Sequence, residues 1–227
     1  MQPYFFPYAQ QIRHIGQCDR WVVFDTPKFT RHTWITRNRV ADRNSGTRYL
    51  TISVRTGASR GSIADAALAP GDWRTSVRNG LRVYDGTAPH YGQTVDLVER
   101  CLAVDAETIA DLNTHILREL AAALGIGTPI ERLSALELGL PDAVAQPQDW
   151  GLLVSKALDA SVYSNAPGGR QIYDADYYRK HGVELEFYEP VPLTYATPGF
   201  TFTPDLSIID ALMWLGTAAM AQWCRDR

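Results

Sequence analysis

An aspartate, a histidine and several arginines follow one another closely in the first part of the chain. Asp25 follows the short apolar run 21–24, and α/β enzymes place functional carboxylates where such a strand ends. His32 comes seven residues later, and an imidazole can take a proton from an attacking amine near neutral pH. We therefore expect Asp25 and His32 to be catalytic. The alternative is that Asp25 pairs with Arg37 or Arg39 to hold a loop in place.

The basic residues are concentrated in segment 28–60. This segment holds eight lysines and arginines and one acidic residue, whereas the whole chain has a net charge of −3. Guanidinium groups bind phosphates in a bidentate manner, so the cluster favours an anionic ligand such as the pyrophosphate of a nucleotide-linked sugar. A solvated basic face is the alternative. The substrate-binding candidates in this segment are Lys28, Trp34, Arg37, Asn38 and Arg39, with Trp34 placed to stack on a base or sugar ring.

Two other segments supply groups that could contact a ligand. The sequence NAPGGR at 165–170 contains paired glycines, whose backbone amides can approach an anion or an oxyanion closely. A plain turn is the alternative there. The opening sequence MQPYFFPY supplies a glutamine that could donate to a carbonyl oxygen and a tyrosine that could stack. The candidates from both segments are Gln2, Tyr4, Asn165, Gly168, Gly169 and Arg170.

Composition narrows the class of protein. The chain has 227 residues, of which 45% are hydrophobic, and its net charge argues against nucleic-acid binding. Cys18, Cys101 and Cys224 form no CxxC pair and the five histidines show no HxH or HExxH spacing, so we expect neither a disulfide framework nor a metal site. With no GxGxxG or P-loop pattern we expect no cofactor. With no signal-like or membrane-spanning segment we expect a cytoplasmic protein without membrane contact.

Strand-like and helix-like segments alternate along the chain. The expected strands are 21–24, 49–55, 128–138, 161–163 and 183–188, and residues 28–43 are expected to be mostly loop. The expected helices are 9–18, 72–84, 95–102, 105–124 with Asp105 as its N-cap, 149–158, 174–181 and 207–223. This order predicts a single α/β domain over residues 1–227. It would be Rossmann-like, with a largely parallel sheet flanked by helices, a helical C-terminal portion and a helical annex around 70–125 and 205–227.

Five sequence blocks, taken together, resemble the WbqC-like family. They are MQPYFFPY at 1–8, WVVFDTPKFTRHTWITRNRV at 21–40, YSNAPGGRQIYD at 163–174, GVELEFYEP at 182–190 and PDLSIIDALMWLG at 204–216. The resemblance spans nearly the whole chain and implies a role in polysaccharide or amino-sugar natural-product biosynthesis. Members usually carry a short apolar strand ahead of the MQPY block, whereas Met1 is the methionine of that block here; either the given sequence begins after that strand or this member lacks it. The Gly-Tyr-Phe-type segment of the family is replaced by QQIRH at 10–14.

The resemblance also implies an activity. We expect a transferase that forms an amide by moving an acyl or aminoacyl group onto an amino sugar, either nucleotide-linked or part of a glycoside. The expected partners are a small-molecule amino-sugar acceptor and an activated acyl donor, which an acyl carrier protein could deliver. One alternative is a non-catalytic module that binds a nucleotide-sugar or a carrier protein. Another is a glycosyltransferase, although the only DxD match, at 174–176, opens a helix. Cys18 is a further candidate as an acyl-accepting thiol, but a buried apolar role is more typical of a free cysteine.

Overall fold

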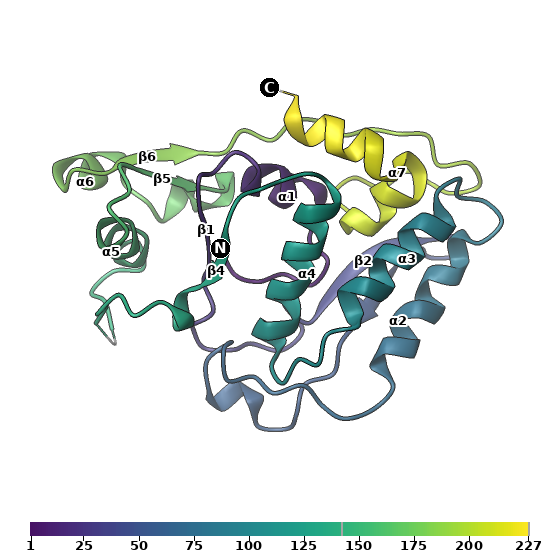
Figure 1. Cartoon of the computed structure of the whole chain (residues 1–227), viewed down its shortest axis with the longest axis horizontal. Helices are drawn as coiled ribbons and strands as arrows, with labels where there is room; N and C mark the ends of the chain where they lie inside the picture. The colour runs from purple at the N-terminus through teal and green to yellow at the C-terminus, as the bar shows by residue number, and fades with distance from the viewer. Residues whose placement is uncertain (142, 227) are drawn as a thin grey trace. The chain divides into compact units, whose positions relative to one another are not determined.

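The strands of this chain form three separate two-stranded sheets. The computed structural model describes residues 1–141 and 143–226, and the chain divides into two compact units (Figure 1). The first unit comprises Met1–Ala135 and Leu193–Arg227, and the second comprises Leu136–Pro192. The fold is a mixed α/β arrangement with short parallel sheets, flanking helices and a C-terminal helix.

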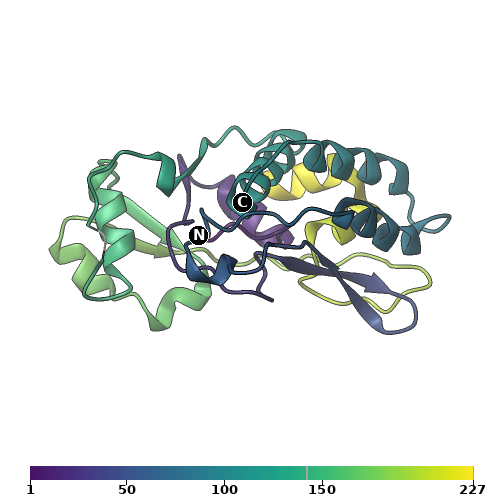
Figure 2. The same cartoon turned by 90° about the horizontal axis from the view of Figure 1, so that it is seen from below.

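The first unit contains most of the core. Its helices are α1 (Ala9–Ile15), α2 (Trp73–Leu81), α3 (Tyr91–Leu102), α4 (Ile109–Ala123) and α7 (Ile208–Arg225). Its strands are β1 (Trp21–Val23), β2 (Arg37–Asp42), β3 (Gly46–Thr51) and β4 (Ile130–Arg132), with β1 parallel to β4 and β2 antiparallel to β3. Figure 2 shows the β2–β3 hairpin on one side of the helices. Helix α2 packs on β3 at Gly80, where a Cβ atom would lie 2.4 Å from Leu50.

The second unit is smaller and rich in tyrosine. It contains α5 (Asp149–Ala157), β5 (Val162–Asn165), α6 (Ala175–Lys180) and β6 (Glu184–Phe187), and β5 runs parallel to β6. Tyr178 is fully buried and stacks on Tyr163, with the ring centroids 5.5 Å apart. Gly151 of α5 faces both rings, because a Cβ atom there would lie within 2.6 Å of each. This glycine therefore lets the helix approach the tyrosines.

The sheet and two element boundaries differ from the sequence-based prediction. Instead of one largely parallel sheet there are two short parallel pairs and a hairpin, and a Rossmann-like order is not formed by these strands. Residues 37–42, predicted as loop, form β2 because their burial alternates, with Asn38 and Val40 buried between partly exposed arginines. Helix α4 is capped by Thr108 rather than Asp105, in a reciprocal capping box with Asp111.

The C-terminal helix was predicted, but it is kinked. Gly216 in α7 has a φ of +72°, a conformation that residues with a Cβ atom rarely adopt. A Cβ atom there would also lie 2.7 Å from Nδ1 of His90. Nearer the start of α7, the buried carboxylate of Asp210 accepts hydrogen bonds from the hydroxyls of Tyr84 and Tyr195. Burial raises the pKa of Asp210 in spite of these two bonds.

The opening segment, residues 1–8, passes through the interior of the first unit without forming a strand. Three of its carbonyl oxygens, those of Pro3, Phe5 and Phe6, are bound by side chains, whereas those of Met1 and Pro7 accept the backbone amides of Phe24 and Ile208. Asn113 Nδ2 donates to Pro3 at 2.8 Å, and Asn38 Nδ2 donates to Phe5 and Phe6 at 3.2 and 2.9 Å. The hydroxyl of Ser207 donates to Phe6 at 2.8 Å, and the amide of Phe5 donates to the carbonyl of Trp34. These bonds join the opening segment to β2, α4 and the start of α7.

Asn113→Ala tests this arrangement. The substitution removes two buried hydrogen bonds, to Pro3 and to Ile35, and leaves both carbonyls without this donor. We expect the free energy of unfolding to fall by about 2 to 4 kcal/mol, since each buried polar group left unpaired costs about 1 to 3 kcal/mol. Urea denaturation measures the change. Asn79→Ala, at an exposed position of α2, is the matched control and should change stability by less than about 0.5 kcal/mol. Equal effects of the two variants would contradict the arrangement.

Candidate functional site

Asp25 lies just beyond the carboxyl end of β1, where the sequence predicted it, and its side chain is fully buried. Its carboxylate accepts the backbone amide of Ser134 at 3.0 Å and the Ser134 hydroxyl at 2.6 Å. The arginine that lies beside Asp25 is Arg132, at 3.8 Å, rather than Arg37 or Arg39. The carboxylate therefore ties the end of β1 to the turn that follows β4.

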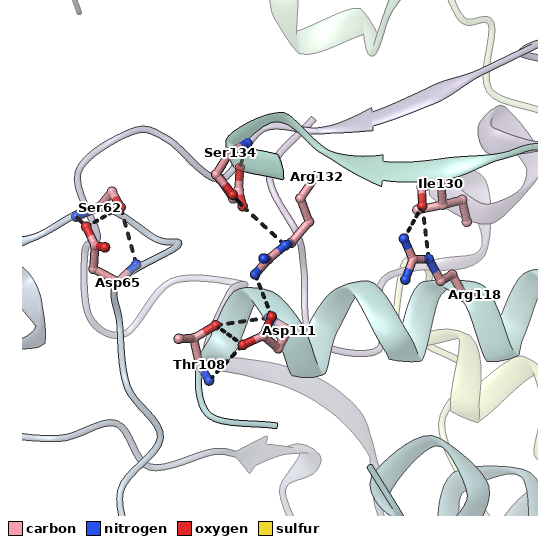
Figure 3. A network of polar contacts seen from close by, with 9 residues as sticks. Ser62, Asp65, Thr108, Asp111, Arg118, Ile130, Arg132 and Ser134 are labelled. Atoms are coloured by element: carbon pink, nitrogen blue, oxygen red, sulfur yellow. Dashed lines mark hydrogen bonds and ion pairs between the residues drawn. The ribbon is translucent and has the colours of Figure 1, made fainter. Parts of the chain in front are cut away.

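Arg132 links this carboxylate to helix α4. Its guanidinium lies 3.8 Å from Asp25 and 2.5 Å from Asp111, the residue of the α4 capping box (Figure 3). On the same helix, Arg118 donates two hydrogen bonds to the carbonyl of Ile130 in β4. The network thus holds the parallel pair of strands against the start of α4. Since Asp25 has no exposed surface and three donors around it, its arrangement is that of a structural anchor.

The outer face of the β2–β3 hairpin carries a cluster of two arginines and two aromatic rings, which we term the arginine–aromatic face: Trp34, Arg37, Arg39 and Tyr49. The guanidinium carbon of Arg37 lies 4.4 Å from the ring centroid of Tyr49. That of Arg39 lies 5.5 Å from the ring centroid of Trp34. The two ring centroids are 6.5 Å apart, and Trp34 and Tyr49 are 40% and 49% exposed. The face is therefore continuous and open to solvent.

The two guanidinium groups of this face have no acidic partner among the residues that the structure describes. In contrast, Arg48 of β3 forms an ion pair with Asp42 at 3.3 Å. Cation–π contacts at exposed sites stabilise by about 0.5 to 1 kcal/mol each without using the N–H donors of arginine, although Nε of Arg39 is itself buried. A ligand that joins an anionic group to a ring can thus bind the guanidinium groups with its anion and stack its ring on an aromatic side chain of this face.

Asn38 lies between these arginines but faces the opposite way. It is 4% exposed, and its side chain donates to the opening segment and accepts the amide of Arg39 at 2.8 Å. Because successive side chains of a strand point to opposite faces, this inward position turns Arg37 and Arg39 outward. The side chain of Asn38 thus binds the backbone of Phe5 and Phe6, and the substrate contact expected for it stays a prediction.

The other candidates of the first unit lie around the same segments. His32 is exposed in a turn with a φ of +59°, two residues before Trp34. Lys28 is exposed and pairs through its backbone with Ser62. Gln2 and Tyr4 are half-buried in the opening segment, and burial raises the pKa of Tyr4. The backbone bond between Phe5 and Trp34 places the opening segment beside the turn that holds His32.

The NAPGGR segment belongs to the second unit and is internally bonded. Asn165 Nδ2 donates to the hydroxyl of Tyr163 at 2.9 Å, and Asn165 Oδ1 accepts the amide of Ala166. Gly169 packs on the ring of Tyr173, where a Cβ atom would lie 3.0 Å from it. Arg170 is paired with Glu189, and Gly168 faces open space. The amide of Gly169, one of the two predicted oxyanion donors, already donates to the carbonyl of Ala166 at 2.9 Å.

The cysteines offer little nucleophilic chemistry. Burial raises the pKa of the Cys101 thiol to about 12 and that of Cys224 to about 11, so neither ionises near neutral pH. The thiol of Cys18 is half-buried and donates to the carbonyl of His14 at 3.3 Å. Within residues 1–141 and 143–226, no group of three potential metal ligands occurs. No helix in these ranges is long and apolar enough to cross a membrane.

Four residues of these clusters were missed by sequence reasoning: Tyr49, Asp111, Arg132 and Ser134. Tyr49 alternates with buried Leu50 on a predicted strand, which is the one available signal that it faces outward. Arg132 and Ser134 meet Asp25 only because β4 lies beside β1, and Asp111 joins them through Arg132; no local spacing reports that pairing. The arginine–aromatic face joins positions 34–39 with position 49 through the hairpin in the same way.

Comparison with known proteins assigns nearly the whole chain to one protein family. A model described as the WbqC-like protein family matches residues 2–222. An uncharacterized protein of Mycobacterium tuberculosis, Rv1507c, is 22% identical over 231 aligned positions, which cover 100% of this chain and 97% of that protein. No solved structure matches the chain.

Comparing Asp25→Ala with Ser134→Ala tests whether Asp25 anchors the whole network or makes only one isolated hydrogen bond. Removing the carboxylate leaves Arg132 and two donors of Ser134 without their acceptor, and we expect a loss of about 3 to 5 kcal/mol in the free energy of unfolding. Ser134→Ala removes one hydrogen bond and should cost about 1 kcal/mol. Urea denaturation of both variants measures the difference. Losses of similar size would show that Asp25 does not hold this network together.

Proposed function

Because this chain belongs to the WbqC-like protein family, we propose that it is a transferase that acylates the amine of a nucleotide-linked amino sugar. The observation that supports this most is the arginine–aromatic face, where Arg37 and Arg39 lie side by side without acidic partners. A sugar linked to a nucleoside diphosphate combines a pyrophosphate with the rings of the base, the pentose and the sugar. Both parts have a counterpart on this face.

In the proposed complex, Arg37 and Arg39 bind the pyrophosphate. Charge-assisted hydrogen bonds from guanidinium to phosphate are about twice as strong as neutral ones, and the fork geometry fits paired oxygens. Trp34 and Tyr49 each keep part of their ring exposed, so they supply the stacking surface for the base or the sugar. The ring beneath each guanidinium also limits its rotation, which lowers the entropy lost when the anion binds.

His32 is the proposed general base. It is exposed, it precedes Trp34 by two residues, and its turn is held by the Thr33 hydroxyl, which donates to the carbonyl of Thr30. Asp25 is unsuited to this task because its carboxylate is buried and bound by Ser134. The amine nitrogen of the sugar attacks the carbonyl carbon of an activated acyl donor such as a thioester. The new C–N bond forms, the C–S bond breaks, His32 takes the proton of the amine, and the thiolate leaves.

The oxyanion of that step needs hydrogen-bond donors. The sequence predicts the backbone amides of the 165–169 loop for this role; within that loop the amide of Ala166 donates to Asn165 Oδ1 and the amide of Gly169 to the carbonyl of Ala166. An acyl carrier protein or a small thioester is the proposed donor.

Arg37→Ala/Arg39→Ala should lose nucleotide-sugar binding. Isothermal titration with UDP-glucosamine and dTDP-glucose measures the dissociation constants. We expect the double variant to bind at least about tenfold more weakly, because one hydrogen bond to a charged group contributes about 1.5 to 3 kcal/mol. Arg48→Ala is the matched control, since Arg48 lies on the opposite face of the same hairpin and is paired with Asp42. Unchanged binding by the double variant, or no binding by the wild type, would contradict the proposal.

His32→Gln should separate binding from turnover. We expect unchanged affinity for the nucleotide-sugar and a rate of amide formation lower by about 10² to 10⁴, the usual contribution of a general base. Mass spectrometry of the sugar product, with acyl- and aminoacyl-thioesters as donors, measures the rate. His115→Gln, on α4, is the control. Full turnover by His32→Gln would exclude the histidine as base, and binding without any turnover in the wild type would favour a binding module.

A further inference from the structure

The second unit contains a cavity that no part of the proposed acceptor site uses. It has a volume of about 350 Å³ and is lined by faces of α5 and α6 and by residues 143–145. Small-molecule sites in proteins begin at about this size and combine an apolar wall with a few fixed polar groups. All of its lining residues belong to the unit Leu136–Pro192. The question is which ligand these side chains would recognise.

One face of α5 supplies both the apolar wall of the cavity and charged groups. Asp149, Leu152, Leu153 and Lys156 follow the helical spacing i, i+3, i+4 and i+7, and all four line the cavity. The two leucines form an apolar floor between an acidic group and a basic group. The α-carbons of Asp149 and Lys156 are about 10 Å apart along the helix, and both side chains line the cavity.

The carboxylate of Asp149 is held in place while keeping acceptor capacity. The Tyr177 hydroxyl donates to Oδ1 and the Gln146 amide donates to Oδ2, each at 2.9 Å. A carboxylate offers about four acceptor positions, so two remain for a ligand. The hydrogen bond to Asp149 also raises the pKa of Tyr177, which keeps that hydroxyl protonated.

The wall opposite α5 is equally fixed. His181 Nδ1 donates to the carbonyl of Tyr177 at 2.8 Å, and the two rings lie 4.5 Å apart. The Tyr178 hydroxyl donates to the carbonyl of Gln148 at 2.7 Å, which ties α6 to the start of α5. A site whose groups are positioned before the ligand arrives loses less entropy on binding.

We propose that this cavity binds an α-amino acid with an apolar side chain, as the aminoacyl part of the donor. The ammonium group binds Asp149, the side chain packs on Leu152 and Leu153, and the carboxyl end lies toward Lys156. This assignment rests on the proposed function, because the acceptor amine requires an acyl donor. Of the acyl and aminoacyl groups expected from the sequence, it selects the aminoacyl group and assigns it a binding site in this unit. The same chemistry is presented by a free amino acid and by an aminoacyl ester, which the experiment separates.

The test is isothermal titration of the full chain with L-leucine, L-leucine methyl ester and N-acetyl-L-leucine. We expect the first two to bind and the third, whose amine is blocked, to bind at least tenfold more weakly. Asp149→Asn should weaken L-leucine and its methyl ester by at least tenfold. Lys156→Gln should weaken only L-leucine, whose carboxylate is free. Asp176→Asn, an exposed α6 acid paired with Arg179, is the matched control and should bind like the wild type.

Three results would overturn the proposal: no binding of L-leucine or its ester at millimolar concentration, equal binding of N-acetyl-L-leucine, or unchanged binding by Asp149→Asn. Circular dichroism of each variant shows that it is folded. The result is independent of the acceptor site, since nucleotide-sugar binding is measured with the hairpin variants. If the chain bound leucine but no nucleotide-sugar, the proposed function would be contradicted, whereas the assignment of this cavity as an amino-acid site would stand. If the chain bound a nucleotide-sugar but no leucine, the proposed acceptor site would stand and the assignment of the cavity to an aminoacyl donor would be wrong.

Discussion

Residues 3–7 of the opening segment are largely buried but do not belong to a sheet, so the carbonyl groups of Pro3, Phe5 and Phe6 are bound by side chains. Two prolines in this segment remove amide donors that a sheet would need. Asn38, Asn113 and Ser207 supply the missing donors from three different elements. The segment also passes next to the end of β1, because the amide of Phe24 donates to the carbonyl of Met1. Strands, α4 and α7 are thus positioned around one extended piece of chain.

This constraint sets the orientation of the arginine–aromatic face. Asn38 must point inward to reach Phe5 and Phe6, so the strand alternation turns Arg37 and Arg39 outward. The antiparallel register then brings Tyr49 opposite Arg39, beside Trp34. The proposed ligand-binding surface is therefore a consequence of how the interior is bonded. On the other side of the segment, the Asp25 network fixes the parallel strands in the same unit.

Local pattern predicted the elements better than their assembly. The apolar stripe of α4 and the Asp174 cap of α6 could be read from spacing, and the structure contains both helices. The strand β2 was missed because its inward positions include asparagine, whose burial depends on distant carbonyls. The pairing of β1 with β4 joins residues more than a hundred positions apart, which no local signal reports. For the same reason Arg37 and Trp34 could be named from sequence, whereas Tyr49 and Arg132 could not.

The central claim is that Arg37 and Arg39 bind the anionic part of a nucleotide-linked sugar. Side-chain nitrogen resonances of arginine report this contact directly. With the protein labelled at arginine Nε, UDP-glucosamine should shift the signals of Arg37 and Arg39 and leave that of Arg48, which is paired with Asp42, unchanged. Shifts confined to arginines outside the hairpin would contradict the account and would place the ligand on another surface.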